Sequence, residues 1–139
     1  MVDPIIYADI TQRIHEVYRA LERFDYSFVE RFFTPDCKCG RNGNWRQGHE
    51  AILAALNERP ANRMVRHVIA SISVEPEGDG FLVQYSMFSA HNDGAPESTP
   101  PFSTTETRLI GDATDRLVWR DGQLKFQEMD GQFLFQAPA

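Results

Sequence analysis

Apolar residues near the N-terminus recur at steps of three and four, which is the spacing of one face of a helix. Asp3-Pro4 suits a helix start, because the fixed φ of proline is compatible with the first helical turn. The spacing therefore predicts a helix from Pro4 to about Phe24. Its single apolar stripe consists of Ile6, Ile10, Ile14, Val17, Tyr18 and Leu21.

Two shorter helices, with a strand and a loop between them, are predicted next. Asp25 or Ser27 can cap a short helix. The apolar face of that helix is formed by Phe28, Val29, Phe32 and Phe33. We expect a short strand at "CKCG" (37–40), a loop at "RNGNWRQG" (41–48) and a third helix at "HEAILAALNER" (49–59).

Apolar and polar residues alternate from Met64 onward, which indicates β-strands. The expected strands cover residues 64–75, 81–91, 102–119 and 123–135, joined mostly by tight turns. Gly111-Asp112 and Gly131 are candidate bulge positions. This order predicts one α+β domain over residues 1–139, in which an antiparallel sheet curls over the three helices into a cone. Such a cone has an apolar interior pocket.

The charge balance argues against a nucleic-acid partner. The chain has 20 acidic and 14 basic residues, a net charge of -6 and no basic run. No apolar stretch approaches the ~20 residues of a membrane-spanning helix. The segment from Met1 to Tyr7 lacks the basic start of a signal peptide. We therefore expect a cytoplasmic protein with no membrane partner.

Cys37 and Cys39 are the only cysteines, and in a strand both would project from the same face. This spacing fits a strained disulfide, half of a metal site, or two reduced thiols. A metal site needs three or four converging ligands, and the sequence has no second Cys/His cluster. The reduced thiols are favoured, and no metal is expected.

His67 is the one titratable residue with catalytic potential inside the first long strand. By alternation, His67, Ile69, Ser71 and Ser73 face one way. Arg66, Val68, Ala70, Ile72 and Val74 face the other way. If the more apolar face packs on the core, His67 points away from it. The alternative is that the first half of the strand lines the pocket and a bulge changes sides.

Four segments of the chain carry a family resemblance. They are "ALERFDYSFVERFFTPDC", "GHEAILAAL", "RMVRHVIASISVEPEGDGFLVQYSMF" and "RDGQLKF". Together they resemble the SnoaL-like group of the nuclear transport factor 2-like superfamily over nearly the whole chain. The resemblance implies the same cone fold. It leaves function open, because this fold hosts enzymes, binding proteins and assembly subunits.

The resemblance also implies a candidate catalytic pair. Scytalone dehydratases and lindane dehydrochlorinases of this fold pair an acidic residue near the end of the first helix with a His on the first long strand. Counted back from "RFFTP", these positions are Glu22 and His67 here, and His91 falls near a second His of the dehydratases. Those enzymes have Asp where this chain has Glu22. The ketosteroid-isomerase pattern fits worse, because the matching region holds Gly40 and Arg41 and no acid.

These residues suit acid–base chemistry. A His with an ordinary pKa near ~6.5 can serve as acid or base, and a carboxylate behind it fixes the tautomer. Tyr18 and Tyr85 are candidate donors to a substrate oxygen, although core packing is the default role of Tyr18. Phe33 and Trp45 are candidate pocket residues, and Trp45 could instead pack on the following helix.

The leading interpretation is a cofactor-free dehydratase or isomerase that acts on a small hydrophobic or aromatic compound. The alternative is a non-catalytic binding or assembly subunit, which would resemble the small subunit of an aromatic-ring-hydroxylating dioxygenase. A homodimer is expected under either interpretation, because the outer face of an open sheet needs cover.

Overall fold

Three helices and six strands build the fold in the computed structural model, which describes residues 1–94, 99–103 and 109–136. They are, in chain order, α1 (Pro4–Glu22), α2 (Phe28–Phe32), β1 (Phe33–Arg41), β2 (Asn44–Gln47), α3 (His49–Asn57), β3 (Arg63–Glu77), β4 (Gly80–Asp93), β5 (Leu109–Arg120) and β6 (Gln123–Gln136). The predicted α+β class is confirmed. Within the described ranges, no helix is both long and apolar enough to cross a membrane.

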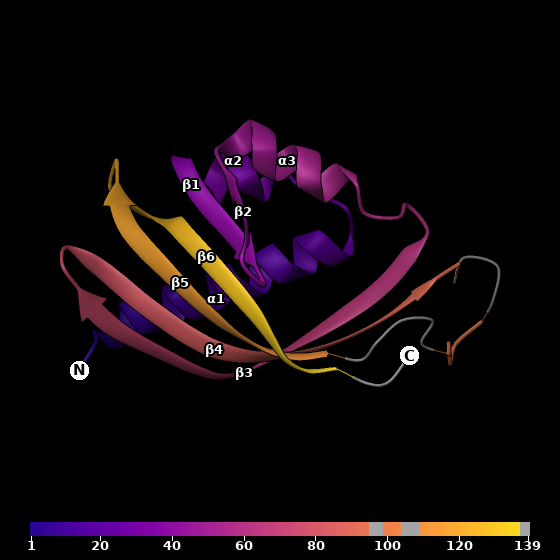
Figure 1. Cartoon of the computed structure of the whole chain (residues 1–139). Coiled ribbons are helices and arrows are strands. Elements are labelled where there is room, and N and C mark those ends of the chain that lie inside the picture. The colour runs from indigo at the N-terminus through magenta and orange to yellow at the C-terminus, as the bar shows by residue number, and fades with distance from the viewer. Residues whose placement is uncertain (95–98, 104–108, 137–139) are drawn as a thin grey trace.

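The strands form one curved, unclosed sheet in the order β2-β1-β6-β5-β4-β3, with the helices gathered on one side of it (Figure 1). The sheet is mixed, because β1 runs parallel to β6 while its other neighbouring pairs are antiparallel. The prediction of a purely antiparallel sheet was wrong at this pair. The parallel pairing brings the end of β1 beside β6 and therefore beside the C-terminal half of the chain.

The segment predicted as a loop at 41–48 is instead a β-hairpin. β1 continues to Arg41, and β2 pairs with it from Asn44. Asn42 and Gly43 both have positive φ, 51° and 83°, which is the backbone that a two-residue hairpin turn requires. The Asn-Gly dipeptide was the sequence signal for this turn, and the polar composition around it concealed the strand.

The first helix begins as predicted and ends slightly earlier. Asp3 caps α1 by accepting a hydrogen bond from the N–H of Ile5 at 2.7 Å, and Pro4 lies in the first turn. The helix ends at Glu22 rather than near Phe24, which has a positive φ of 59°. Glu22 therefore lies in the last turn, where a negative charge gains nothing from the helix dipole.

A β-bulge in β3 decides which way His67 faces. Ala70 pairs with Ser86 and Ser73 pairs with Gln84, so β3 carries one extra residue between these pairs. Ser71 has a positive φ of 59°, which marks it as the bulge residue. Val65, Ile69, Ile72 and Val74 are all at least half-buried, so the inward positions change from odd to even numbers across the bulge. The first half of β3 thus turns His67 toward the helices.

A register shift occurs at Gly111, one of the two expected bulge positions, but not at Gly131. The register between β5 and β6 shifts at Ile110/Gly111 and again at Arg116/Leu117, and the extra residues are on β6. Gly131 pairs regularly with Ala113, so no bulge occurs there. Residues 104–108 of the predicted third strand lie outside the described residues.

Apolar side chains also lie on the outer face of the sheet. Val68, Phe88, Ile110 and Phe135 are cross-strand neighbours, and all four are exposed in the single chain. The homodimer expected from the sequence stays a prediction.

Candidate functional site

A cavity of about 600 Å³ lies between the helices and the inner face of the sheet. Its size falls within the range of small-molecule pockets. Apolar side chains from α1, α3 and four strands form much of its wall: Val17, Leu21, Ile52, Leu56, Val65, Met87, Leu109 and Phe133. The cavity is large enough for a molecule of aromatic-ring size or somewhat larger.

Glu22 and His67 are in direct contact at one side of this cavity. One carboxylate oxygen of Glu22, Oε2, accepts from the backbone N–H of His67 at 2.7 Å and lies 3.1 Å from Nδ1 of its ring. The side chains are only 7% and 11% exposed, respectively. The two bonds come from one residue to one oxygen, so they orient the His67 ring relative to its own backbone.

This arrangement defines the roles of the two ring nitrogens. A carboxylate can only accept, so Nδ1 carries the proton and donates it to Glu22. Nε2 is then the unprotonated nitrogen on a ring that lines the cavity. Burial lowers the pKa of His67, the bond and charge of Glu22 act in the opposite direction, and Arg59 and Arg41 lower it further. The net shift is downward, so the imidazole is neutral and basic at neutral pH.

A chain of hydroxyl and carboxyl groups lies next to His67. The ring of Tyr18 contacts the His67 ring at a centroid distance of 5.1 Å. The hydroxyls of Tyr18 and Tyr85 are 3.0 Å apart, and Tyr85 donates to Oδ2 of Asp115 at 2.7 Å. Because the Tyr85 proton goes to Asp115, Tyr18 donates to the Tyr85 oxygen. Burial raises the pKa of both tyrosines, so both hydroxyls keep their protons.

Asp115 is a buried acid that sequence reasoning missed. It is 1% exposed and lines the cavity, and its Oδ1 has no hydrogen-bond partner within the described part of the chain. Burial raises its pKa to about 8, although the bond from Tyr85 acts in the opposite direction. Asp115 is therefore mostly a neutral acid at pH 7. The sequence did contain a signal for this buried acid. Asp115 interrupts an alternating series of inward residues in β5, which are Leu109, Gly111, Ala113 and Leu117.

Four arginines also line the cavity: Arg41, Arg46, Arg59 and Arg63. Sequence reasoning missed them too, because they are spread over the chain and form no basic run. Arg63 pairs with Asp93 through two bonds of 2.9 and 3.1 Å. Arg59 donates to the carbonyl of Leu21 and the hydroxyl of Tyr26 at 2.9 and 3.0 Å. Only the fold brings these positive charges to one cavity.

The remaining predicted site residues divide between the cavity and other places. His91 on β4 and Phe33 on β1 line the cavity. Tyr85 does not line it: the residue is buried behind Tyr18 and holds Asp115. Trp45 does not line it either, since its neighbours Asn44 and Arg46 face inward and alternation turns Trp45 outward. Its ring covers Gly40, where a Cβ would lie 2.8 Å from the indole.

The two cysteines project from the same face of β1, as the spacing predicted. Both are free thiols; Cys37 is buried in the core and Cys39 lines the cavity. The described residues contain no group of three or more His, Cys, Asp and Glu side chains that could hold a metal ion.

The comparison with protein families identifies the fold group. A family model described as SnoaL-like domain matches residues 6–130. The chain belongs to the SnoaL-like family. This agrees with the resemblance seen in the sequence. No curated protein matches the chain.

Solved structures similar to this SnoaL-like chain share its fold at low sequence identity. A type 2 hexachlorocyclohexane dehydrochlorinase has a TM-score of 0.80 and 15% identity, with 97% of this chain and 89% of that chain covered. A Catenulispora acidiphila protein in complex with S-DNPA has a TM-score of 0.77 and 19% identity, with 94% of this chain and 95% of that chain covered. ActVI-ORFA from Streptomyces coelicolor has a TM-score of 0.75 and 16% identity, with 92% of this chain and 96% of that chain covered. At these identities the similarity establishes the fold.

Proposed function

We propose that this SnoaL-like protein is an enzyme that eliminates water from, or isomerises, a small hydrophobic or aromatic compound. The observation that carries the proposal is the Glu22–His67 pair at the wall of the cavity. A neutral His with its Nδ1 proton held by a buried carboxylate is a general base whose Nε2 is ready to accept a proton. A role in stability alone would not require the ring to line a cavity.

In the proposed elimination, Nε2 of His67 removes a proton from a substrate carbon. The electrons of that C–H bond form the new double bond, and the bond to a hydroxyl on the neighbouring carbon breaks. Asp115, neutral below its pKa of about 8, donates a proton to the departing hydroxyl, which leaves as water. The proton on His67 then returns the carboxylate of Asp115 to its neutral form. Glu22 stabilises the imidazolium while it exists.

In an isomerisation the same groups would act on an enolate. His67 would move the proton between two carbons, and neutral Asp115 would donate a hydrogen bond to the negative oxygen. The dehydrochlorinase named above performs an elimination by its name, which supports this reaction class for the fold group. Cofactor-free catalysis stays a part of the proposal.

The test replaces His67 by asparagine. The side-chain amide nitrogen of the introduced residue would take the place of Nδ1, so His67→Asn keeps a donor for Glu22 and removes only the basic Nε2. Turnover of a panel of cyclic β-hydroxy ketones and phenolic cyclic alcohols is measured by loss of substrate. We expect a decrease of about 10²-fold or more. The matched control is His15→Asn, since His15 is exposed on α1 with its Nδ1 bonded to the Thr11 carbonyl.

Equal turnover by wild type and His67→Asn would remove His67 from the mechanism. The non-catalytic alternative predicts another outcome: wild type binds members of the panel but converts none of them.

A further inference from the structure

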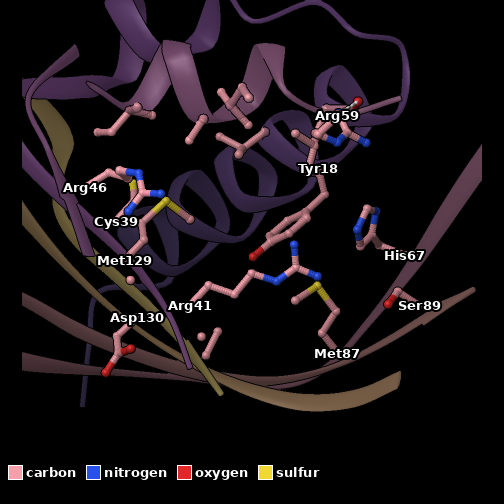
Figure 2. Close-up of a pocket in the computed structure, with 18 of the residues that line it drawn as sticks. Tyr18, Cys39, Arg41, Arg46, Arg59, His67, Met87, Ser89, Met129 and Asp130 are labelled. Atoms are coloured by element: carbon pink, nitrogen blue, oxygen red, sulfur yellow. Dashed lines mark hydrogen bonds between the residues drawn. The ribbon is translucent and has the colours of Figure 1, made fainter. Parts of the chain in front are cut away.

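Arg41 places a positive charge inside the cavity, and no carboxylate of the described residues pairs with it. It is the last residue of β1, and alternation from Cys37 and Cys39 turns it to the inner face. In Figure 2 its side chain extends into the cavity toward the side where Tyr18, Met87 and His67 lie. The residue is exposed, and partial burial of its guanidinium lowers the pKa of Arg41. An external molecule in the cavity can therefore reach it.

The guanidinium of Arg41 is held in place without using its hydrogen-bond donors. It lies over the ring of Phe133, 4.6 Å from the ring centroid. Within the described ranges, no carboxylate lies within 4.0 Å of it and it donates to no acceptor. Arg59 and Arg63 differ, because their donors bind protein groups. Arg41 is positioned by stacking and keeps its donors for a ligand.

The charges around Arg41 favour an anion. Of the cavity arginines, only Arg63 has a carboxylate partner among the described residues. The acids that line the cavity are Asp130 and Asp115, and Asp115 is neutral below about pH 8. The carboxylates of Glu22 and Asp93 are already bound to His67 and Arg63, which leaves Arg41, Arg46 and Arg59 against Asp130. His67 is also neutral at pH 7, because its pKa is lowered. The cavity is therefore positive, although the chain as a whole has a net charge of -6.

We propose that the substrate is a hydrophobic organic acid whose carboxylate binds to Arg41. The planar fork of a guanidinium matches the two oxygens of a carboxylate. The apolar part of such a substrate would lie against the aliphatic wall, including Leu56 and Met87. This inference rests on the proposed function and narrows its substrate class, and it makes Arg41 a residue that determines specificity.

Binding of a carboxylate would also change His67. The positive charge of Arg41 contributes to the lowered pKa of His67. A bound carboxylate offsets that charge, so His67 becomes a stronger base when the substrate is present. The cavity would therefore bind an organic acid preferentially, and the carboxylate of that acid would make His67 a stronger base.

The experiment compares matched ligands by isothermal titration calorimetry at neutral pH and low ionic strength. The probes are benzoate, naphthoate and anthracene carboxylate, each paired with its neutral amide. Wild type is expected to bind at least one carboxylate about ten- to a hundredfold more tightly than its amide. Arg41→Gln should lose this preference and keep its affinity for the amide. Arg41→Lys, which keeps the charge without the fork, should retain part of the preference.

Arg66→Gln is the matched control. Arg66 precedes His67 on β3, is exposed on the opposite face of the sheet and does not line the cavity. Arg66→Gln removes the same positive charge as Arg41→Gln, but from outside the cavity. It should therefore leave the preference for the carboxylate over the amide unchanged. The proposal is overturned if no carboxylate binds more tightly than its amide, if Arg41→Gln and Arg41→Lys keep the full preference, or if Arg66→Gln also loses it.

His67→Asn separates this proposal from the proposed function. The carboxylate preference should persist in His67→Asn, because Arg41 is intact. If wild type shows no preference yet His67→Asn abolishes turnover of neutral compounds, only the substrate class is wrong. If the preference exists but turnover does not depend on His67, only the catalytic role is wrong.

Discussion

One oxygen of Glu22 binds both the backbone N–H and the ring Nδ1 of His67, at 2.7 and 3.1 Å. The carboxylate comes from the last turn of α1, where the helix dipole disfavours it, so its stabilisation comes from His67. The contact joins α1 to β3 across 45 residues of sequence. The Glu22 side chain is long enough to reach both nitrogens from the end of the helix.

Glu22→Gln should reduce turnover strongly while leaving the fold intact. The amide oxygen can still accept from the His67 N–H, but it carries no charge to stabilise the imidazolium. We expect a decrease of about 10²-fold or more in kcat/KM. Because the bond and charge of Glu22 raise the pKa of His67, the variant should also move the acidic limb of the pH–rate profile to lower pH. Glu16→Gln on the exposed face of α1 is the control, and an unchanged acidic limb in Glu22→Gln would contradict the role of Glu22.

The wild-type pH–rate profile should be bell-shaped. Turnover rises as His67 loses its proton, which happens below its ordinary pKa of ~6.5 because burial lowers that pKa. Turnover falls near pH 8 as Asp115 ionises and can no longer donate. Asp115→Asn should lower the maximum and remove the alkaline limb. A profile that stays flat through pH 8 in wild type would exclude Asp115 as the proton donor.

Asp115 should also make the stability of the protein depend on pH. Its pKa is about 8 in the folded chain and near 3.8 when unfolded, so between these values the unfolded chain releases a proton that the folded chain retains. Rising pH therefore favours unfolding, by up to about 1.4 kcal/mol per pH unit from this group. The contribution is fully present below pH 3.8 and is lost as pH rises to about 8.

Denaturant unfolding of wild type and Asp115→Asn from pH 4 to pH 9 measures this contribution. Asn keeps an acceptor for Tyr85 but does not titrate. The unfolding free energy of Asp115→Asn minus that of wild type should increase as pH rises, and then level off above pH 8. Parallel curves for the two proteins over the whole range would mean that Asp115 is already ionised in the folded state.

The bulge at Ser71 should be sensitive to side-chain shape. Its φ of 59° disfavours β-branched residues most and favours Gly. Ser71→Val should lower the free energy of unfolding by about 1–2 kcal/mol relative to Ser71→Gly. At Ser73, an exposed position of the same strand without positive φ, Val should be tolerated at least as well as Gly. Equal responses at the two serines would show that the bulge is not restrained by Ser71.

Much of the fold was readable from local pattern. The spacing of apolar residues from Ile6 to Leu21 predicts α1, because helix periodicity is a property of neighbouring residues. The order of helices and strands predicts the α+β class. The family resemblance singled out Glu22 and His67 as a pair, and the structure places them in contact.

Other features depend on partners that lie far away in the sequence. The parallel pairing of β1 with β6 and the inward position of Asp115 follow from the sheet order, which local pattern does not contain. The position of Arg41 also depends on tertiary structure. Its segment was predicted as a loop, and it is a strand only because β1 pairs with β2. Its guanidinium meets Phe133 only because β6 lies beside β1.

The sequence by itself determined most of the helices and strands, and with the family resemblance it singled out Glu22 and His67. The tertiary structure decided the direction in which His67 points. Alternation along β3 gives two opposite answers, depending on which half of the strand is counted. The choice depends on one extra residue at Ser71, and an extra residue exists only relative to the strand that it pairs with. Register is a relation between two strands, so the fold alone could turn this histidine into the cavity.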